Sequence, residues 1–216
     1  MLRRLLTTAL VLSTLLAAVS VQADLNPNID KRAFDVFQEG LELYNKSEYL
    51  AALKKFHKAL DISPEFLEAN YYVAASLAAG GDCTSAMPYI KKVLDMDNSF
   101  AGALFLAGRC SYQLHKLQDA KEYLTRARQL KEDSPKILFL LAKVMGELGD
   151  KSTEIQYYQD AVLADPDFFE AWFNLGVSLM EADRKSEGAE ALEQALRLSR
   201  GNVEALQQLA QALAES

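Results

Sequence analysis

Apolar residues recur every three or four positions along most of the chain, and short turns interrupt this pattern at regular intervals. Residues 172–179 and 192–196 illustrate it, because each stretch places its apolar side chains at the spacing of one helix face. Gly149 lies in one of the breaks, and Pro166 follows another stretch because proline cannot continue a helix. The pattern predicts pairs of amphipathic helices joined by short turns.

Residues of similar size recur at a constant spacing of 34 positions. One column of small residues consists of Gly40, Ala74, Gly108, Ala142 and Gly176, and a second small column consists of Ala59, Val93, Ala127, Ala161 and Ala195. A bulky column consists of Phe56, Ile90, Leu124, Tyr158 and Leu192. Helix axes approach closely only where no large side chain separates them, so we expect the small columns at the closest contacts. A fixed period of this length is typical of stacked helical repeats.

These columns, together with proline near the end of some units, resemble the tetratricopeptide repeat. The resemblance implies an all-α fold, a right-handed α-solenoid of helix-turn-helix repeats with a C-terminal capping helix. We assign five units, residues 33–66, 67–100, 101–134, 135–168 and 169–202. Departures from the family pattern are Glu39, Asn70 and Glu154 at apolar or small positions, and Asn98, Glu132 and Arg200 where proline is usual.

The stack needs polar ends, because each hairpin has two apolar faces. We expect residues 203–216 to form a capping helix and tail that begins after an N-cap at Asn202. Helical spacing predicts that Val203, Leu206, Leu209 and Leu213 cover the fifth unit. Within the second unit, Pro88 is expected in the first turn of a helix capped by Thr84, where a missing N–H costs little.

The first 23 residues have the composition of a secretory signal peptide. Arg3 and Arg4 precede an uncharged apolar run over residues 5–21, and small residues surround the expected cleavage point after Ala23. Residues 24–32 then form an N-terminal linker, and the protein is periplasmic or secreted. The alternative is an uncleaved signal anchor, since the apolar run is near the lower length limit for a membrane span. After cleavage, we expect no stable membrane insertion.

Charge argues against nucleic acid as a partner. Without the signal peptide the chain has 21 basic and 30 acidic residues, which gives a formal charge of −9. Phosphate backbones repel such a chain in the absence of a dense basic patch, and the sequence has no such run.

In the family that the chain resembles, the first helices of the units line a concave groove that binds partners. The fifth position of every unit is aromatic: Phe37, Tyr71, Phe105, Phe139 and Phe173. These rings either line the groove or fill gaps between adjacent first helices, and one ring can do both. The other predicted groove residues are Leu41, Tyr44, Tyr72, Leu106, Arg109, Tyr112, Leu140, Lys143, Asn174 and Val177.

Arg109 and Lys143 occupy the ninth position of two consecutive units in an otherwise acidic chain. They are either solvated surface charges or a clamp for a carboxylate, and the clamp predicts a partner with apolar and acidic groups. The family that the chain resembles also has a chaperone-binding branch, whose carboxylate clamp uses lysine at the fifth position and asparagine at the ninth. Phe37 and Leu41 stand there, so that clamp is absent from the first unit.

Cys83 and Cys110 are the two cysteines of the chain. In an oxidising compartment they can form a disulfide, and the alternative is a pair of buried thiols. His57 and His115 have no other ligand at metal-binding spacing, and the sequence lacks a phosphate-binding loop or a nucleophile motif. We therefore expect no cofactor, no metal and no catalytic residue.

The sequence favours a non-catalytic protein-interaction scaffold in the bacterial cell envelope, which binds a peptide or protein segment in its groove. Two alternatives remain: a structural protein that self-associates into homo-oligomers, and an assembly factor tethered to the membrane by the uncleaved anchor. An enzyme with scattered groove residues is the weakest interpretation, because the sequence offers no acid-base pair or nucleophile.

Overall fold

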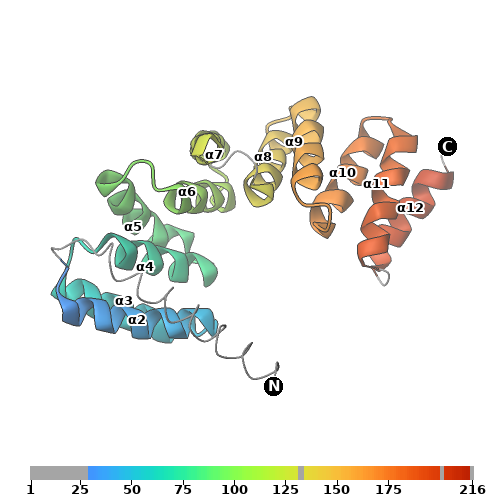
Figure 1. Ribbon diagram of the computed structural model, residues 1–216. Coiled ribbons are helices and arrows are strands. Elements are labelled where there is room, and N and C mark those ends of the chain that lie inside the picture. Colours follow the sequence, from blue (N-terminus) through green and yellow to red (C-terminus); the bar gives the residue numbers. More distant parts are fainter. Residues whose placement is uncertain (1–28, 131–133, 200–201, 215–216) are drawn as a thin grey trace, which may run out of the picture. The chain divides into compact units, whose positions relative to one another are not determined.

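The computed structural model describes residues 29–130, 134–199 and 202–214, and in these residues it contains eleven α-helices and no strand (Figure 1). The prediction of an all-α fold of repeated helix pairs is therefore confirmed. The expected signal peptide and its cleavage point, most of the linker, and the departures Glu132 and Arg200 lie outside the described residues.

The helices form successive helix-turn-helix pairs. The first helices are α2 (Lys31–Asn45), α4 (Leu67–Ala79), α6 (Ala101–Gln113), α8 (Pro135–Glu147) and α10 (Phe169–Glu181). The second helices are α3 (Tyr49–Ile62), α5 (Cys83–Met96), α7 (Leu117–Leu130), α9 (Lys151–Ala164) and α11 (Lys185–Leu198), and α12 (Val203–Ala214) follows. All second helices begin 34 residues apart, as do the first helices from α4 on.

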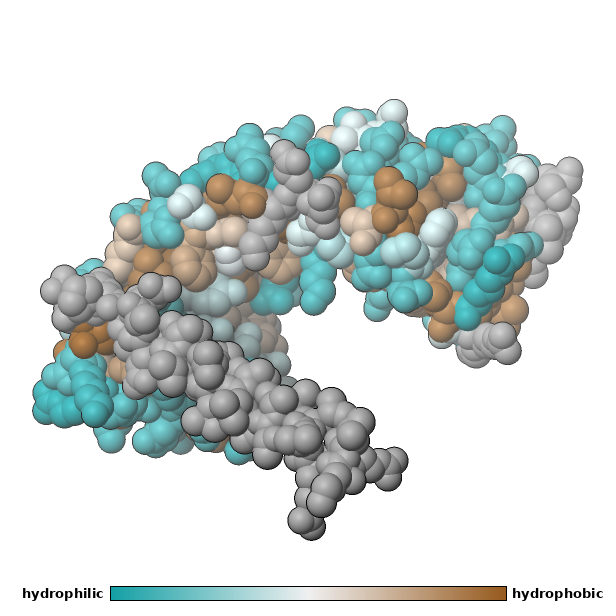
Figure 2. Space-filling model, in the orientation of Figure 1, coloured by the Kyte–Doolittle hydropathy of each residue, from teal (hydrophilic) through white to brown (hydrophobic). Residues whose placement is uncertain are grey.

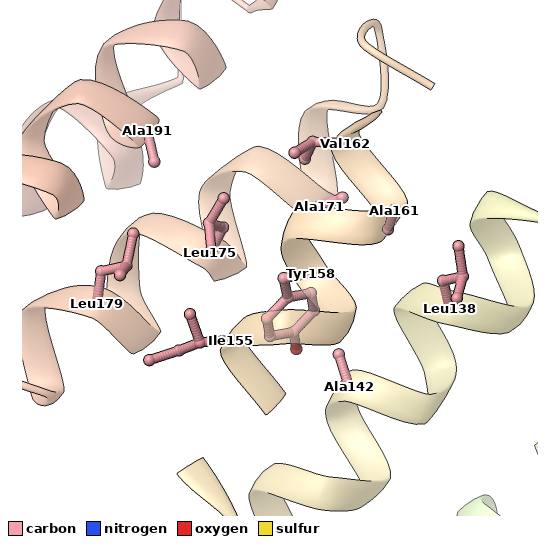
Figure 3. Packing of buried hydrophobic residues seen from close by; sticks show 10 residues of the cluster. All are labelled: Leu138, Ala142, Ile155, Tyr158, Ala161, Val162, Ala171, Leu175, Leu179 and Ala191. Carbon is pink, nitrogen blue, oxygen red and sulfur yellow. The ribbon is translucent and has the colours of Figure 1, made fainter. Parts of the chain in front are cut away.

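The chain divides into two compact units, one ending at Ala69 and the other beginning at Asn70. In the first unit, the rings of Phe37, Phe56 and Phe66 pack together as a small aromatic core between α2 and α3. In the second unit, the core continues from one helix pair to the next. Figure 3 shows one part of it, to which α8, α9, α10 and α11 all contribute buried side chains around Tyr158 and Leu175.

In the first, third and fifth hairpins, a glycine of the first helix lies against a large side chain of the second helix. A Cβ atom added to Gly108 would lie 2.5 Å from Leu124 Cγ, and one added to Gly176 would lie 2.6 Å from Leu192 Cγ. Real Cβ atoms do not approach other atoms so closely, so only glycine allows this helix separation. The small column at the eighth position therefore meets the bulky column at the twenty-fourth, within the same hairpin.

The departure at Glu154 is accommodated by a second glycine. Glu154 is buried in α9 opposite Gly146 of α8, where an added Cβ would lie 2.7 Å from the carboxyl carbon. Ser178 of the next pair donates a hydrogen bond to Glu154 Oε1 at 2.6 Å. Lys151 Nζ lies 2.6 Å from Glu154 Oε2 and 2.7 Å from Glu181 Oε2. The buried carboxylate thus has charged and polar partners, which burial of an acidic group requires.

The turn between the two helices of every pair uses one residue with positive φ. These residues are Ser47, Gly81, His115, Gly149 and Asp183, again 34 positions apart. After two of them, Asp82 and Asp150 cap the next helix, accepting hydrogen bonds from Ser85 N at 2.9 Å and Thr153 N at 3.1 Å. Hydrogen bonds from the side chains of Ser85 and Thr153, together with these backbone bonds, lower the pKa of the two carboxyl groups because they stabilise the charged form.

The expected position of Pro88 in its helix is wrong. The N-cap of α5 is Asp82 rather than Thr84, so Pro88 lies inside the helix, beyond its first turn. There its missing N–H removes a hydrogen bond of the regular helix.

The predicted contact face of the last helix is also partly wrong. Asn202 caps α12 as predicted, because its Oδ1 accepts from Ala205 N at 2.9 Å. Ala205 is buried, whereas Val203 is 65% exposed and Leu206 is 49% exposed. Ala205 continues a buried column at the third position of the units, which includes Ala103 and Ala171. Leu206 occupies the position of Leu104, which packs against α7, the second helix of its pair. No second helix follows α12 among the described residues, so Leu206 stays exposed.

We predict that Gly108→Ala lowers the free energy of unfolding by about 1–3 kcal/mol, because the new methyl group overlaps Leu124 and forces α6 and α7 apart. Chemical denaturation of the purified protein measures the change. Gly80→Ala is the matched control, since the nearest atom there is a backbone oxygen at 3.4 Å, an ordinary contact. Equal stability of the two variants would show that the small column does not set the helix separation.

Candidate functional site

Four of the five aromatic residues at the fifth position pack against another ring of their own repeat. The ring centroid of Phe37 lies 4.7 Å from that of Phe66 and 5.5 Å from that of Phe56. Phe37 is only 4% exposed, so it is a core residue. The prediction that its ring lies open in a groove is therefore wrong, because two phenylalanines of the same unit enclose it.

The equivalent rings in the compact unit that begins at Asn70 are packed on one side and remain half-buried. Tyr71 lies 5.0 Å from Phe100, and Phe139 lies 5.0 Å from Phe168 and 5.7 Å from Tyr158, measured between ring centroids. Phe105 and Phe173 are half-buried as well, and Phe173 stacks with Phe169 at 6.1 Å. These four rings therefore contribute to packing and still present part of their surface to solvent.

The structure brings a second aromatic column next to the first, which the sequence analysis did not identify. It consists of the last residue of each predicted unit, where Phe66, Phe100 and Phe168 stand. The centroid of each of these rings lies 4.7–5.0 Å from the centroid of the fifth-position ring in the same repeat. The signal was present in the sequence as phenylalanine at multiples of 34, but the column is broken by Ser134 and Asn202.

Lys143, one of the two predicted clamp residues, reaches from α8 to α6. Its Nζ lies 5.1 Å from the ring centroid of Tyr112 and 6.0 Å from that of Phe139, within reach of cation–π attraction. The Tyr112 hydroxyl donates a hydrogen bond to Glu147 Oε1 at 2.5 Å. Burial and this bond raise the pKa of Tyr112 above its usual range, so the phenol stays neutral.

Arg109, the other predicted clamp residue, lies one helical turn before Tyr112 on α6. It is half-buried, and its Nε is enclosed without a hydrogen-bond partner among the described residues. Among those same residues, no carboxylate pairs with Arg109 or Lys143. Two consecutive first helices therefore present cations beside half-buried rings, an arrangement that suits an apolar segment with a carboxylate.

The remaining predicted residues have mainly local contacts. Tyr71 and Tyr72 meet edge to face at 5.2 Å, and Asn174 donates a hydrogen bond to the backbone oxygen of Glu170 at 2.6 Å. Val177 is half-buried on α10. Leu106 and Leu140 are buried core residues, so their prediction as groove residues is wrong. Leu41 and Tyr44 lie in the first compact unit and are half-buried, with Tyr44 at 5.2 Å from the ring of Tyr49.

A family model described as anaphase-promoting complex, cyclosome, subunit 3 matches residues 45–127, and one described as tetratricopeptide repeat matches residues 155–203. The chain is also 25% identical over 147 residues to tetratricopeptide repeat protein 8 of Caenorhabditis elegans, a match covering 67% of this chain and 29% of that protein. The chain is a tetratricopeptide repeat protein. It spans less than two thirds of the length of this relative and of the other curated relatives that it matches.

Solved tetratricopeptide structures share the fold. The crystal structure of MamA protein aligns with a TM-score of 0.68 at 20% identity, covering 78% of this chain and 92% of that one. The crystal structure of YrrB, titled as a TPR protein with an unusual peptide-binding site, aligns with a TM-score of 0.68 at 20% identity, covering 87% and 95%. The tetratricopeptide fold fits a protein-interaction scaffold, and such scaffolds are generally non-catalytic.

The hydropathy of the tetratricopeptide surface is mixed. On the face of residues 70–214 in Figure 2, hydrophobic residues form separate brown patches among hydrophilic ones. Within the described ranges, no helix is both long and apolar enough to span a bilayer. The same residues contain no cluster of three or more side chains that could hold a metal ion.

A large hollow on the second helices was not predicted from the sequence. It lies between α5 and α7, has a volume of about 690 Å³, and has an apolar wall that includes Met87, Pro88 and Tyr123. Its charged groups already have partners in the chain: Lys91 pairs with Asp95 at 2.9 Å, and Arg126 donates to the backbone oxygen of Asn98 at 3.0 Å. The unpaired cations of α6 and α8 distinguish the first-helix face from this hollow.

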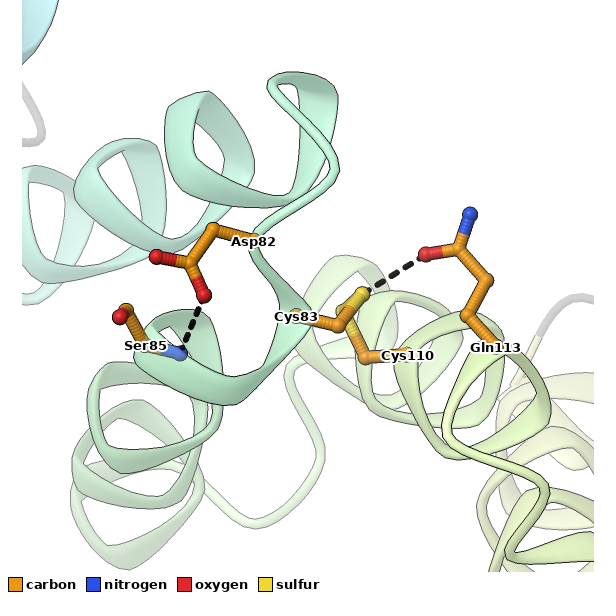
Figure 4. The surroundings of a disulfide bond; sticks show 5 residues. All are labelled: Asp82, Cys83, Ser85, Cys110 and Gln113. Atoms are coloured by element: carbon orange, nitrogen blue, oxygen red, sulfur yellow. Dashed lines mark hydrogen bonds between the residues drawn. A yellow bond between two sulfur atoms is a disulfide. The ribbon is translucent and has the colours of Figure 1, made fainter.

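The two cysteines of the tetratricopeptide array form a disulfide in the structure (Figure 4). Their Cα atoms are 5.1 Å apart, within the usual range for such bonds, and both residues are buried. Cys83 is the first residue of α5 and Cys110 lies in α6, so the bond joins one helix pair to the next. The side-chain carboxamide of Gln113 lies 2.8 Å from Cys83 Sγ.

We predict that the double variant Cys83→Ala/Cys110→Ala unfolds with a free energy about 2–4 kcal/mol lower than the oxidised wild type, because the bond restricts the unfolded chain. Denaturation with and without dithiothreitol checks this. The reductant should shift the wild-type transition toward that of the variant and leave the variant unchanged. Two titratable thiols in unfolded wild-type protein kept free of reductant would contradict the prediction.

Proposed function

We propose that this tetratricopeptide repeat protein is a non-catalytic interaction scaffold of the bacterial cell envelope. It binds a peptide or protein segment with apolar and acidic groups on the face formed by α6 and α8. The observation that carries the proposal is the pair of cations, Arg109 and Lys143, that lack a carboxylate partner among the described residues. Lys143 also lies over the half-buried rings of Tyr112 and Phe139. A charge left unpaired next to apolar surface is a cost that a bound carboxylate would offset.

The envelope location rests on two features of the chain. Residues 1–23 have the composition of a signal peptide, with cleavage expected after Ala23. A buried disulfide is also a typical feature of proteins in oxidising compartments, such as the periplasm. Both features support a protein that works outside the cytoplasm, either in the periplasm or after secretion.

The choice of a peptide segment as ligand rests on the shape and chemistry of the face. Rings that are packed on one side and open on the other offer rigid apolar surface at little entropic cost. The structurally similar YrrB is described as a TPR protein with an unusual peptide-binding site. A peptide with alternating apolar and acidic side chains would satisfy both the rings and the cations.

Self-association is a second candidate function, favoured by the last helix. Val203 and Leu206 are exposed on α12, and Leu206 occupies a position that a second helix covers in earlier pairs. If this surface joins copies of the chain, Leu206→Glu should convert an oligomer into a monomer in multi-angle light scattering. A wild-type monomer at micromolar concentration would reject this candidate.

We predict that a photo-crosslinking amino acid placed at Phe139 captures a partner in the native compartment. The variant Arg109→Glu/Lys143→Glu should reduce that capture about tenfold, because it replaces attraction to the carboxylate by repulsion. Quantitative mass spectrometry of the crosslinked products measures both effects.

The controls separate this result from general changes in charge or contact. Lys116→Glu/Lys121→Glu changes the net charge by the same amount at exposed positions near and on α7, and should leave capture unchanged. A crosslinker at Leu163, which is 82% exposed on the second helix α9, should not capture the same partner. Undiminished capture by the Arg109/Lys143 variant would reject the proposed face.

A further inference from the structure

The third repeat lacks a ring that three other repeats share. In those repeats a phenylalanine in the last position covers the fifth-position ring, at centroid distances of 4.7 Å from Phe37, 5.0 Å from Tyr71 and 5.0 Å from Phe139. In the third repeat the last residue is Ser134, and the fifth-position ring is Phe105. A hydroxymethyl group therefore stands where the repeat register places a benzyl group.

A pocket lies at this position. It has a volume of about 140 Å³ and is lined by Ala101, Gly102, Phe105, Ser134, Lys136 and Ile137, all from α6 and the beginning of α8. An apolar protein cavity of about 150 Å³ is large enough to bind benzene, so the space here suits a single aromatic ring. The pocket thus has the size of the side chain that the register lacks.

The walls of the pocket are mainly apolar, and one cation, Lys136, lines it. Gly102 is packed closely by the rings of Tyr71 and Phe100, whose atoms lie 3.1 Å from the position of an added Cβ. Lys136 occupies the position of Gly102 in the next repeat, and it lines the pocket. It is exposed and pairs with no carboxylate among the described residues. Among the described residues, no acidic side chain lines the pocket. Ser134 makes no capping bond to α8, so the positive end of that helix adds to the rim.

We propose that this pocket receives a phenylalanine side chain of the bound segment, with an acidic residue next to it that pairs with Lys136. The inference rests on the proposed function, because it names a side chain of the segment that the α6–α8 face binds. The incoming ring covers Phe105 as Phe66, Phe100 and Phe168 cover the equivalent rings. The partner's phenylalanine then supplies the ring contact that the third repeat lacks.

Methyl-labelled protein and a small probe test this pocket without the natural partner. We expect N-acetyl-Phe-Asp amide to shift the methyl resonances of Ile137 and Ala101 in NMR titrations, and N-acetyl-Ala-Asp amide to shift them much less. In Ser134→Phe, the protein's own ring fills the pocket, so the affinity for the phenylalanine probe should fall at least about tenfold. Ser134→Ala is the matched control and should bind the probe as the wild type does.

A charge exchange tests the acidic neighbour. Lys136→Glu should weaken binding of N-acetyl-Phe-Asp amide and strengthen binding of N-acetyl-Phe-Lys amide. Thermal melting verifies that each variant is folded, and Lys136→Glu remains informative if Ser134→Phe does not fold. Absence of Ile137 shifts with the phenylalanine probe in the wild type would overturn the inference.

Partner capture distinguishes a failure of this inference from a failure of the proposed function. If a crosslinker at Phe139 captures the partner equally well in folded Ser134→Phe protein, the partner does not insert a ring here. The inference would then be wrong, while the α6–α8 face would remain a binding surface. Loss of capture in Ser134→Phe, with capture retained in Ser134→Ala, supports the pocket.

Discussion

The contact between a glycine of the first helix and a large residue of the second sets the helix separation in three of the five hairpins. Glycine at Gly108 and Gly176 allows the side chains of Leu124 and Leu192 to pack directly against the backbone of the opposite helix. This contact fixes how far apart the two helices lie, and the three-residue turn fixes how they are joined. Because the turn length and the size pattern of these residues repeat, residues 34 positions apart occupy corresponding positions in their helix pairs.

Because positions correspond between repeats, a residue that departs from the pattern can be compared with the residues at the same position in the other repeats. At Glu154 the departure is matched by Gly146, Ser178 of the next pair donates a hydrogen bond to one carboxylate oxygen, and Lys151 of the same helix forms an ion pair with the other. At Ser134 the structure holds no matching side chain, and a pocket results. A departure that a second substitution matches, as at Glu154, preserves the packing. A departure without a matching side chain, as at Ser134, leaves a pocket that another molecule can occupy. The unpaired cations Arg109 and Lys143 lie on the same two first helices as this pocket.

The sequence by itself determined the fold class, the period and the pairing of helices. These properties are local or strictly periodic: amphipathic spacing, turn residues and size columns depend on residues near one another or at a fixed separation. For the same reason the N-cap at Asn202 was predictable, since a cap bonds to its own helix. The fifth-position rings and the two cations were also recognisable as columns, although the sequence did not reveal how exposed they are.

Only the tertiary structure decided exposure and partnership. Phe37 is enclosed by rings at two other positions of its unit, whereas Tyr71 and Phe139 keep an open side, although the three occupy the same position of the repeat. Leu206 has the spacing of a core residue, yet it is exposed because no second helix follows it among the described residues. The bond between Cys83 and Cys110 likewise required their distance in space. Burial depends on what other segments place against a side chain, and the side chain's own position in a periodic pattern does not contain that information.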